Sequence, residues 1–201
     1  MKKFLISFSY IFHPLFIPLY ATFFYVFANH SYAVTKEKTI IFLQVVVVTI
    51  LIPLLVFYLL RSIGKISSAM APKIGERKMP LVIQCFLIIL LVKKGITIEQ
   101  YPEFHFFFLG ALLSTLIALL LLFAKTKVSL HMMGISALTM FVFGLSRHFQ
   151  TQNTVWITFL LFMNAAVASS RLEMRAHTPK ELTIGFLLGS IPQMMLMYLW
   201  L

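Results

Sequence analysis

Aspartate is absent from this chain of 201 residues, and all six of its acidic residues are glutamates. Proteins bind magnesium and calcium through clusters of carboxylates, so the sequence supplies few ligands for a hard divalent metal. Cysteine is nearly absent too, because Cys85 stands alone inside an apolar run. A disulfide within the chain is excluded, and Cys85 is interpreted as a packing residue. We therefore expect a protein that works without a metal or another cofactor.

Charge is scarce and mostly of one sign. Charged residues make up 11% of the chain against 60% hydrophobic residues, and 17 Lys and Arg give a formal net charge of +11. The mean hydropathy of +0.94 excludes a soluble domain. A basic balance in a membrane protein suits anionic lipid head groups or phosphates, or serves as a topology signal. We expect membrane lipids as partners and no nucleic acid.

Long apolar runs define the predicted architecture. Runs of about 20 apolar residues cross a bilayer as helices, and these runs are continuous rather than alternating, which excludes a barrel. Seven such segments occur, at residues 4–29, 39–60, 80–92, 104–124, 129–146, 154–170 and 182–201. The prediction is an all-α, polytopic transmembrane bundle of about six to seven helices. It forms a single membrane-embedded domain over 1–201 and crosses the cell (inner) membrane several times.

Two of these segments depart from a simple span. The first resembles a signal peptide at its start, but its apolar part is too long for one, so it is interpreted as a retained helix. Its His13-Pro14 pair and Pro18 are predicted to kink or break that helix. The segment 80–92 is short for a span, and the flanking Lys93 and Lys94 could extend it by snorkelling.

Ionisable residues gather in three segments that share one side of the predicted bundle, 73–80, 127–134 and 169–185. The first, "KIGERKMP", holds Lys73 and Arg77, which lie on one face of a helix at this spacing. The second, "KVSLHMMG", holds Ser129 and His131.

The third segment, "SSRLEMRAHTPKELTIG", holds Arg171, His177 and Glu181. Together the three segments contain the groups for phosphate transfer without a metal. Arginine and lysine bind phosphoryl oxygens, and a neutral imidazole attacks phosphorus. A carboxylate holds that imidazole in the required tautomer, and a second histidine protonates the leaving oxygen.

The three segments resemble the signature motifs of the type 2 phosphatidic acid phosphatase superfamily. Those motifs run Lys-x6-Arg-Pro, Pro-Ser-Gly-His and Ser-Arg-x5-His-x3-Asp. The third match is close, with Ser170, Arg171, His177 and Glu181 at the expected spacing. The opening "FHPLFIPLY" and the form "ERKMP" are similar to a compact bacterial branch of this superfamily. The resemblance covers essentially the whole chain in motif order and helix spacing.

By this resemblance the protein is expected to be a lipid phosphate or prenyl diphosphate phosphatase with a phosphohistidine intermediate. His177 would be the nucleophile, Glu181 its orienting acid and His131 the leaving-group acid. Phosphate binding would fall to Lys73, Arg77, Ser129 and Arg171. The resemblance implies a helical bundle that needs no metal, with its site at the membrane surface. Candidate substrates are phosphatidate, phosphatidylglycerol phosphate, undecaprenyl diphosphate and phosphorylated lipid A.

The chain departs from the motifs at several positions. Leu130 stands where the second motif has glycine, Val128 replaces its proline, and Glu181 replaces an aspartate. In the first motif proline comes at Pro80 and not directly after Arg77. These departures keep a second interpretation open, a catalytically degenerate protein that binds phosphate or lipid. A third, a small transporter, is disfavoured because the sequence has no inverted repeat.

Several of these residues also fit simpler roles. "TPKE" at 178–181 is a capping box, so Glu181 fits both a helix cap and an orienting acid. Ser129 fits a helix N-cap, Arg175 an interfacial anchor, and Lys127 either a phosphate contact or a solvated loop residue. No motif includes the remaining histidines, and no role is assigned to His13, His30, His105 or His148.

Overall fold

The computed structural model describes residues 2–27, 35–67 and 74–201, and every regular element in them is helical. The all-α prediction is therefore confirmed for this part of the chain. The elements are α1 (Lys2–Ile11), the 3-10 turn η1 (Pro14–Phe16), α2 (Ile17–Phe27), α3 (Thr35–Val46), the π-helical turn η2 (Val47–Leu51), α4 (Ile52–Ser62), α5 (Ile74–Lys94), α6 (Pro102–Phe123), α7 (Leu130–His148), α8 (Thr154–Glu173) and α9 (Pro179–Met197).

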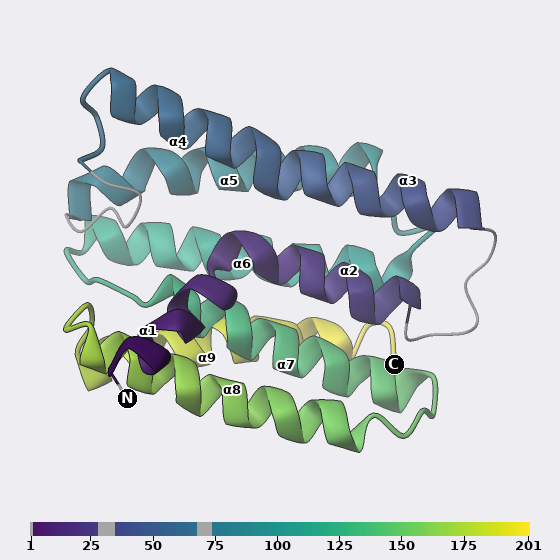
Figure 1. Ribbon diagram of the computed structural model, residues 1–201. Helices are drawn as coiled ribbons and strands as arrows, with labels where there is room; N and C mark the ends of the chain where they lie inside the picture. Colours follow the sequence, from purple (N-terminus) through teal and green to yellow (C-terminus); the bar gives the residue numbers. More distant parts are fainter. Residues whose placement is uncertain (1, 28–34, 68–73) are drawn as a thin grey trace.

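The long helices lie side by side along one direction (Figure 1). Helix α7 is central and packs against α9, α8 and α2, while α6 packs against α9 and α5. Helices α3 and α4 cover α5 on the far side of the bundle, and α1 lies on α8. The core at the centre is aromatic, with Tyr25, Phe104, Phe107 and Phe141 all fully buried and in ring contact.

Two glycines let α9 approach α7 closely. A Cβ atom added at Gly185 would come within 2.5 Å of the Ser129 carbonyl oxygen, and Gly189 lies against the backbone of Met133. Small residues four apart are a common device for close helix contact in membranes. Because Ser129 also begins α7 and Gly185 follows closely after His177, this contact brings the second and third polar segments together.

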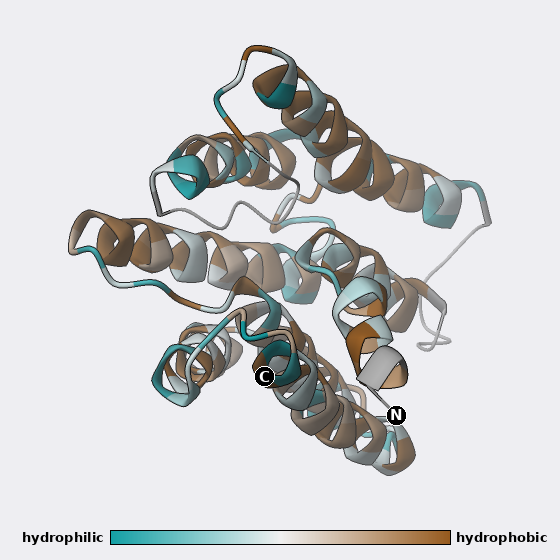
Figure 2. Cartoon of the chain, turned by 60° about the vertical axis from the view of Figure 1, so that its left-hand side comes forward, coloured by the Kyte–Doolittle hydropathy of each residue, from teal (hydrophilic) through white to brown (hydrophobic). Residues whose placement is uncertain are grey.

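Several helices are long and apolar enough to cross a membrane. By length and composition, four described helices qualify, 36–62, 102–123, 130–148 and 154–173, or five spans if the bent pair Phe4–Ile11 and Pro14–Val26 counts as one. Most residues along the helices are hydrophobic, and hydrophilic ones lie mainly near helix ends (Figure 2). The chain is therefore membrane-embedded. The six to seven spans predicted are not confirmed, because α5 carries cations in its first and last turns and α9 contains Lys180, Glu181 and Gln193.

The break in the first apolar segment falls where it was predicted. His13 has an extended backbone (ψ 140°), and the helices on either side are bent by 45°. Pro14 disfavours helical geometry at the preceding residue and cannot donate a backbone hydrogen bond, so the helix ends there. Pro18 lies in the first turn of α2, where proline is tolerated.

Helix α5 is longer than its apolar run indicated. It extends over Ile74–Lys94 rather than 80–92, so Arg77 lies in its first turns and Pro80 lies inside it. The helix continues through polar residues because its ends need no apolar surroundings. This extension sets Arg77 over the start of α7.

Candidate active site

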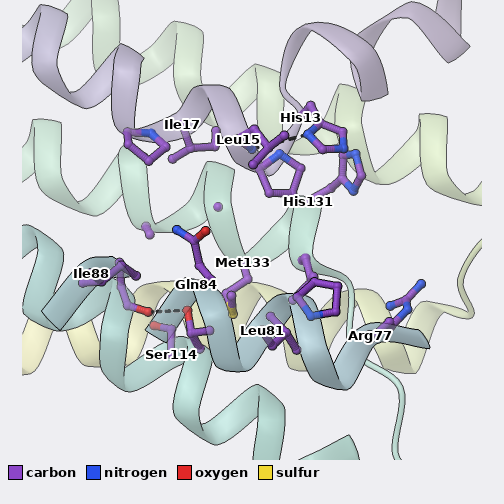
Figure 3. Close-up of a pocket in the computed structure, with 18 of the residues that line it drawn as sticks. His13, Leu15, Ile17, Arg77, Leu81, Gln84, Ile88, Ser114, His131 and Met133 are labelled. Atoms are coloured by element: carbon purple, nitrogen blue, oxygen red, sulfur yellow. Dashed lines mark hydrogen bonds between the residues drawn. The ribbon is translucent and has the colours of Figure 1, made fainter. Parts of the chain in front are cut away.

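A cavity runs between η1, α2, α5, α6 and α7. Its volume is about 180 Å³, and it is partly open to the outside. Figure 3 shows His13, His131 and Arg77 at one end of it, and Ile17 and Ile88 at the other. The cavity is therefore polar at one end and apolar along the rest of its length.

Four of the predicted site residues line this one cavity, Arg77, His131, Arg171 and His177. They come from the start of α5, the start of α7, the end of α8 and the turn before α9, which lie at the same end of the bundle (Figure 1). The expected convergence of the three polar segments is thus present in the structure. Lys73 lies outside the described residues.

His177 is held by Glu181. Its Nδ1 lies 2.7 Å from the Glu181 Oε2, and the His177 side chain is 2% exposed against 22% for Glu181. A carboxylate only accepts hydrogen bonds, so Nδ1–H donates and Nε2 carries the lone pair in the neutral ring. The same Oε2 accepts from the Thr178 N–H, and the Thr178 hydroxyl accepts from the Glu181 N–H. The capping box is therefore present, and one carboxylate serves as both cap and partner of the histidine.

The surroundings of His177 favour the neutral ring. The pKa of His177 is lowered from 6.5 to about 4, mainly by burial, although the hydrogen bond to Glu181 acts in the opposite direction. The positive charges of Lys127, Arg77 and Arg171 contribute to this lowering. A neutral imidazole with an Nε2 lone pair is the form that acts as a nucleophile.

Arg171 is buried without a matching anion. It is 3% exposed, and its Nε lacks a hydrogen-bond partner in the described structure. One terminal nitrogen donates to the Met174 sulfur at 3.6 Å, a weak acceptor. Within the part of the chain that the structure describes, no carboxylate forms an ion pair with Arg171. A guanidinium in this state is costly unless a ligand supplies the negative charge.

Arg77 and Lys127 complete the positive end of the site. Arg77 is buried, and a terminal nitrogen donates to the Val128 carbonyl at 3.2 Å. Burial lowers the pKa of Arg77, while Glu181 opposes that change. Lys127 is half-buried, and its ammonium donates to the Ala176 carbonyl at 2.7 Å. It ties the second segment to the turn that carries His177.

His131 is fixed by the N-terminal helix. Its Nε2 lies 3.1 Å from the Ser9 carbonyl, which only accepts, so Nε2–H donates. The Ser9 hydroxyl is also 2.6 Å from the Ser170 hydroxyl, directly before Arg171. The ring of His131 meets that of His13 edge to face, with centroids 5.2 Å apart. Helix α1 and the break after it are therefore part of the site.

Ser129 is not among the residues that line the cavity. It is fully buried, and its hydroxyl accepts from the Met132 N–H at 3.4 Å as the N-cap of α7. The helix-cap interpretation describes its geometry. Arg175 is exposed and has φ +48° at the end of α8, away from the cavity lining.

Sequence reasoning missed the contribution of the N-terminal segment. His13 lines the cavity and Ser9 holds His131, yet neither belongs to the three polar segments. The available signal was His13 before Pro14, an ionisable group at a predicted helix break inside an apolar segment. Such groups at membrane depth are often functional.

Comparison with known proteins found no relative, because no family model, no curated protein and no solved structure matches this chain. The chemistry of the site therefore rests on its own residues. They amount to two guanidinium groups, an oriented neutral histidine and a second histidine around one cavity.

Proposed function

We propose that this protein is a metal-independent phosphatase for a lipid phosphate or prenyl diphosphate, acting through a phosphohistidine. The observation that carries the proposal is the unbalanced positive charge at one end of an apolar cavity. Arg77 and Arg171 are buried there beside a histidine oriented by Glu181, and Arg171 has no acidic partner in the described residues. A phosphate supplies the missing charge, and its ester is the group that the histidine attacks.

The proposed reaction has two steps. In the first, the Nε2 lone pair of His177 attacks phosphorus, the N–P bond forms and the bond from phosphorus to the lipid oxygen breaks. His131, in its protonated form, gives its proton to that leaving oxygen. In the second, water attacks phosphorus and gives a proton to the now neutral His131, the N–P bond breaks, and inorganic phosphate leaves. Arg77 and Arg171 balance the charge on the phosphoryl oxygens throughout.

The apolar part of the cavity suits the tail of the substrate. Along α5 the lining runs from Arg77 to Ile88, a distance of roughly 16 Å at the rise of an α-helix. A chain attached to the phosphate can lie along this lining, among residues such as Leu81 and Phe108. Burial of the tail then favours amphiphilic phosphates over inorganic or sugar phosphates.

A second candidate function is a phosphate-lipid binder that has lost turnover. Two observations favour it. The Leu130 side chain lines the cavity at the position where the similar motif has glycine, and the Nε2–H of His131 is engaged by the Ser9 carbonyl. Either feature could keep a bound phosphate from the geometry that the reaction needs.

Phosphate release separates the two candidates. The full chain in detergent micelles is incubated with phosphatidate, phosphatidylglycerol phosphate and prenyl diphosphates, with and without a chelator. The phosphatase releases phosphate at the same rate in chelator and is blocked by vanadate. The binder retains radiolabelled lipid phosphate without releasing phosphate. Complete loss of activity in chelator, restored by magnesium or zinc, would contradict the proposed mechanism.

A further inference from the structure

The break between α1 and α2 places a third histidine at the polar end of the cavity. His13 lines the cavity together with His131, Arg171 and His177, and its ring packs against that of His131. In Figure 3 the two rings lie side by side, across the cavity from Arg77. None of the three polar segments includes His13, so it is the fold that brings His13 to their cavity.

The local backbone determines which nitrogen of His13 can donate. His13 is the N-cap of η1, and its Nδ1 accepts from the Leu15 N–H at 3.4 Å. Pro14 directly after it fixes the start of the turn. With Nδ1 acting as acceptor, the proton of the neutral ring is on Nε2, on the far side of the ring from this contact.

We propose that His13 is an anion-binding residue of this site, donating its Nε2–H to an oxygen of the bound phosphate. The inference rests on the proposed function for the identity of the anion. Three features support it. The ring lines the polar end of the cavity, and the hydrogen bond that Nδ1 accepts from Leu15 places the ring proton on Nε2. The buried Arg171 gives that end an excess of positive charge, which favours an anion. The other interpretation is that His13 only caps the turn and packs against His131.

Two substitutions separate these interpretations. His13→Asn keeps a good N-cap acceptor close to the backbone but loses the donor at the Nε2 position. His13→Gln places an amide N–H near the Nε2 position but caps less well. If His13 donates to the anion, the affinity of His13→Gln for the anion should resemble that of wild type. If His13 only caps the turn, His13→Asn should be the variant that resembles wild type. His105→Asn is the matched control, since His105 is also half-buried and bonded to the backbone but does not line the cavity.

The measurement is the affinity for inorganic phosphate and for vanadate. It is read from the concentration dependence of thermal stabilisation of the purified full chain in detergent micelles. We expect His13→Asn to weaken binding about tenfold or more, as for loss of a hydrogen bond to a charged group. His13→Gln should stay within about threefold of wild type, and His105→Asn should not differ from it.

Wild-type affinity in His13→Asn would overturn the inference, and so would an equal loss in both His13 variants. If His13→Asn does not yield folded protein, His13→Leu replaces it in the comparison with His13→Gln, because leucine fills space without a donor. Failure of the proposed function has a different signature. If the wild type binds vanadate through His13 but hydrolyses no lipid phosphate, the inference about His13 holds and the proposed phosphatase activity is excluded. A wild type that binds neither anion overturns both.

Discussion

Two histidine–glutamate pairs lie at opposite ends of the bundle and have opposite patterns of burial. At the candidate site His177 is buried and Glu181 is partly exposed, with 2.7 Å between them. At the other end His148 is 30% exposed, whereas the Glu103 side chain is 4% exposed and lies 3.1 Å from it. Glu103 also accepts from the Tyr25 hydroxyl at 2.9 Å.

The difference shows that a histidine–carboxylate contact does not by itself define a catalytic site. Glu103 joins α2, α6 and α7 through Tyr25 and His148, and its buried charge is satisfied by protein groups. His177 has a carboxylate on one nitrogen and a cavity beside it, and the same cavity is lined by the buried Arg171, whose charge no carboxylate balances within the described residues. A cluster whose buried charges are all paired with protein groups stabilises the fold, whereas a buried charge without a protein partner favours binding of a ligand of opposite charge.

The largest expected effect follows from removing the nucleophile. His177→Ala should reduce turnover by about 10³-fold or more, because the proposed covalent intermediate cannot form. The matched change His148→Ala should leave turnover unaltered, although both remove a histidine from a glutamate. The assay is phosphate release together with trapping of acid-labile, base-stable phosphate on the protein from radiolabelled substrate. Equal hydrolysis by wild type and His177→Ala would show that the nucleophile is misassigned and that residues 169–185 form only a capped helix end.

The second effect concerns the buried guanidinium. Arg171→Gln should lower kcat/KM by about 10²-fold, as for loss of one donor to the transition state. It should not lower the thermal unfolding midpoint, because removing an unbalanced buried charge relieves a desolvation cost. Arg147→Gln, at the exposed last turn of α7, is the control and should change neither quantity. Loss of stability with unchanged kcat/KM would instead assign Arg171 a structural role.

The third effect is on stability and belongs to the other end of the bundle. Glu103→Gln should lower the free energy of unfolding by about 1–3 kcal/mol, because it weakens hydrogen bonds to a buried charged group. Turnover below the unfolding temperature should stay at the wild-type level. Thermal unfolding in micelles and phosphate release measured on the same sample test both halves. A large loss of turnover in this variant, with stability retained, would contradict a purely structural role for Glu103.

The smallest effect is a change in the pH profile. Only the neutral form of His177 attacks, and its pKa is about 4, so wild-type activity should fall as the pH drops through 4 rather than 6.5. Glu181→Gln should slow turnover about tenfold and move this acid limb to lower pH, since the carboxylate raises the pKa of His177. Glutamine still serves the capping box, so folding should be retained. An acid limb near 6.5 in wild type would contradict the assignment.

The pH measurement needs a temperature well below unfolding. Between pH 6.5 and 4 the unfolded chain binds more protons at His177 than the folded chain, so stability declines as the pH falls. Circular dichroism at each pH distinguishes this loss of fold from a protonated nucleophile.

The sequence predicted helix caps and the helix break correctly because these features depend on neighbouring residues. The capping box at 178–181, the helix break at His13-Pro14 and the cap at Ser129 each depend on residues within one turn of helix, so neighbouring letters predict them. The predicted extent of α5 was wrong because it was taken from the length of the apolar run. The helix continues through Arg77 and the other polar residues at its start.

By itself the sequence determined that this protein is a helical membrane protein, since hydropathy and continuous apolar runs depend on composition alone. Tertiary structure decided which ionisable groups share the cavity. The close contact of Gly185 with Ser129 joins two polar segments, and the bond from His131 to Ser9 adds a third part of the chain more than a hundred residues away. Such contacts depend on how helix surfaces fit together, and no spacing of neighbouring residues encodes that fit.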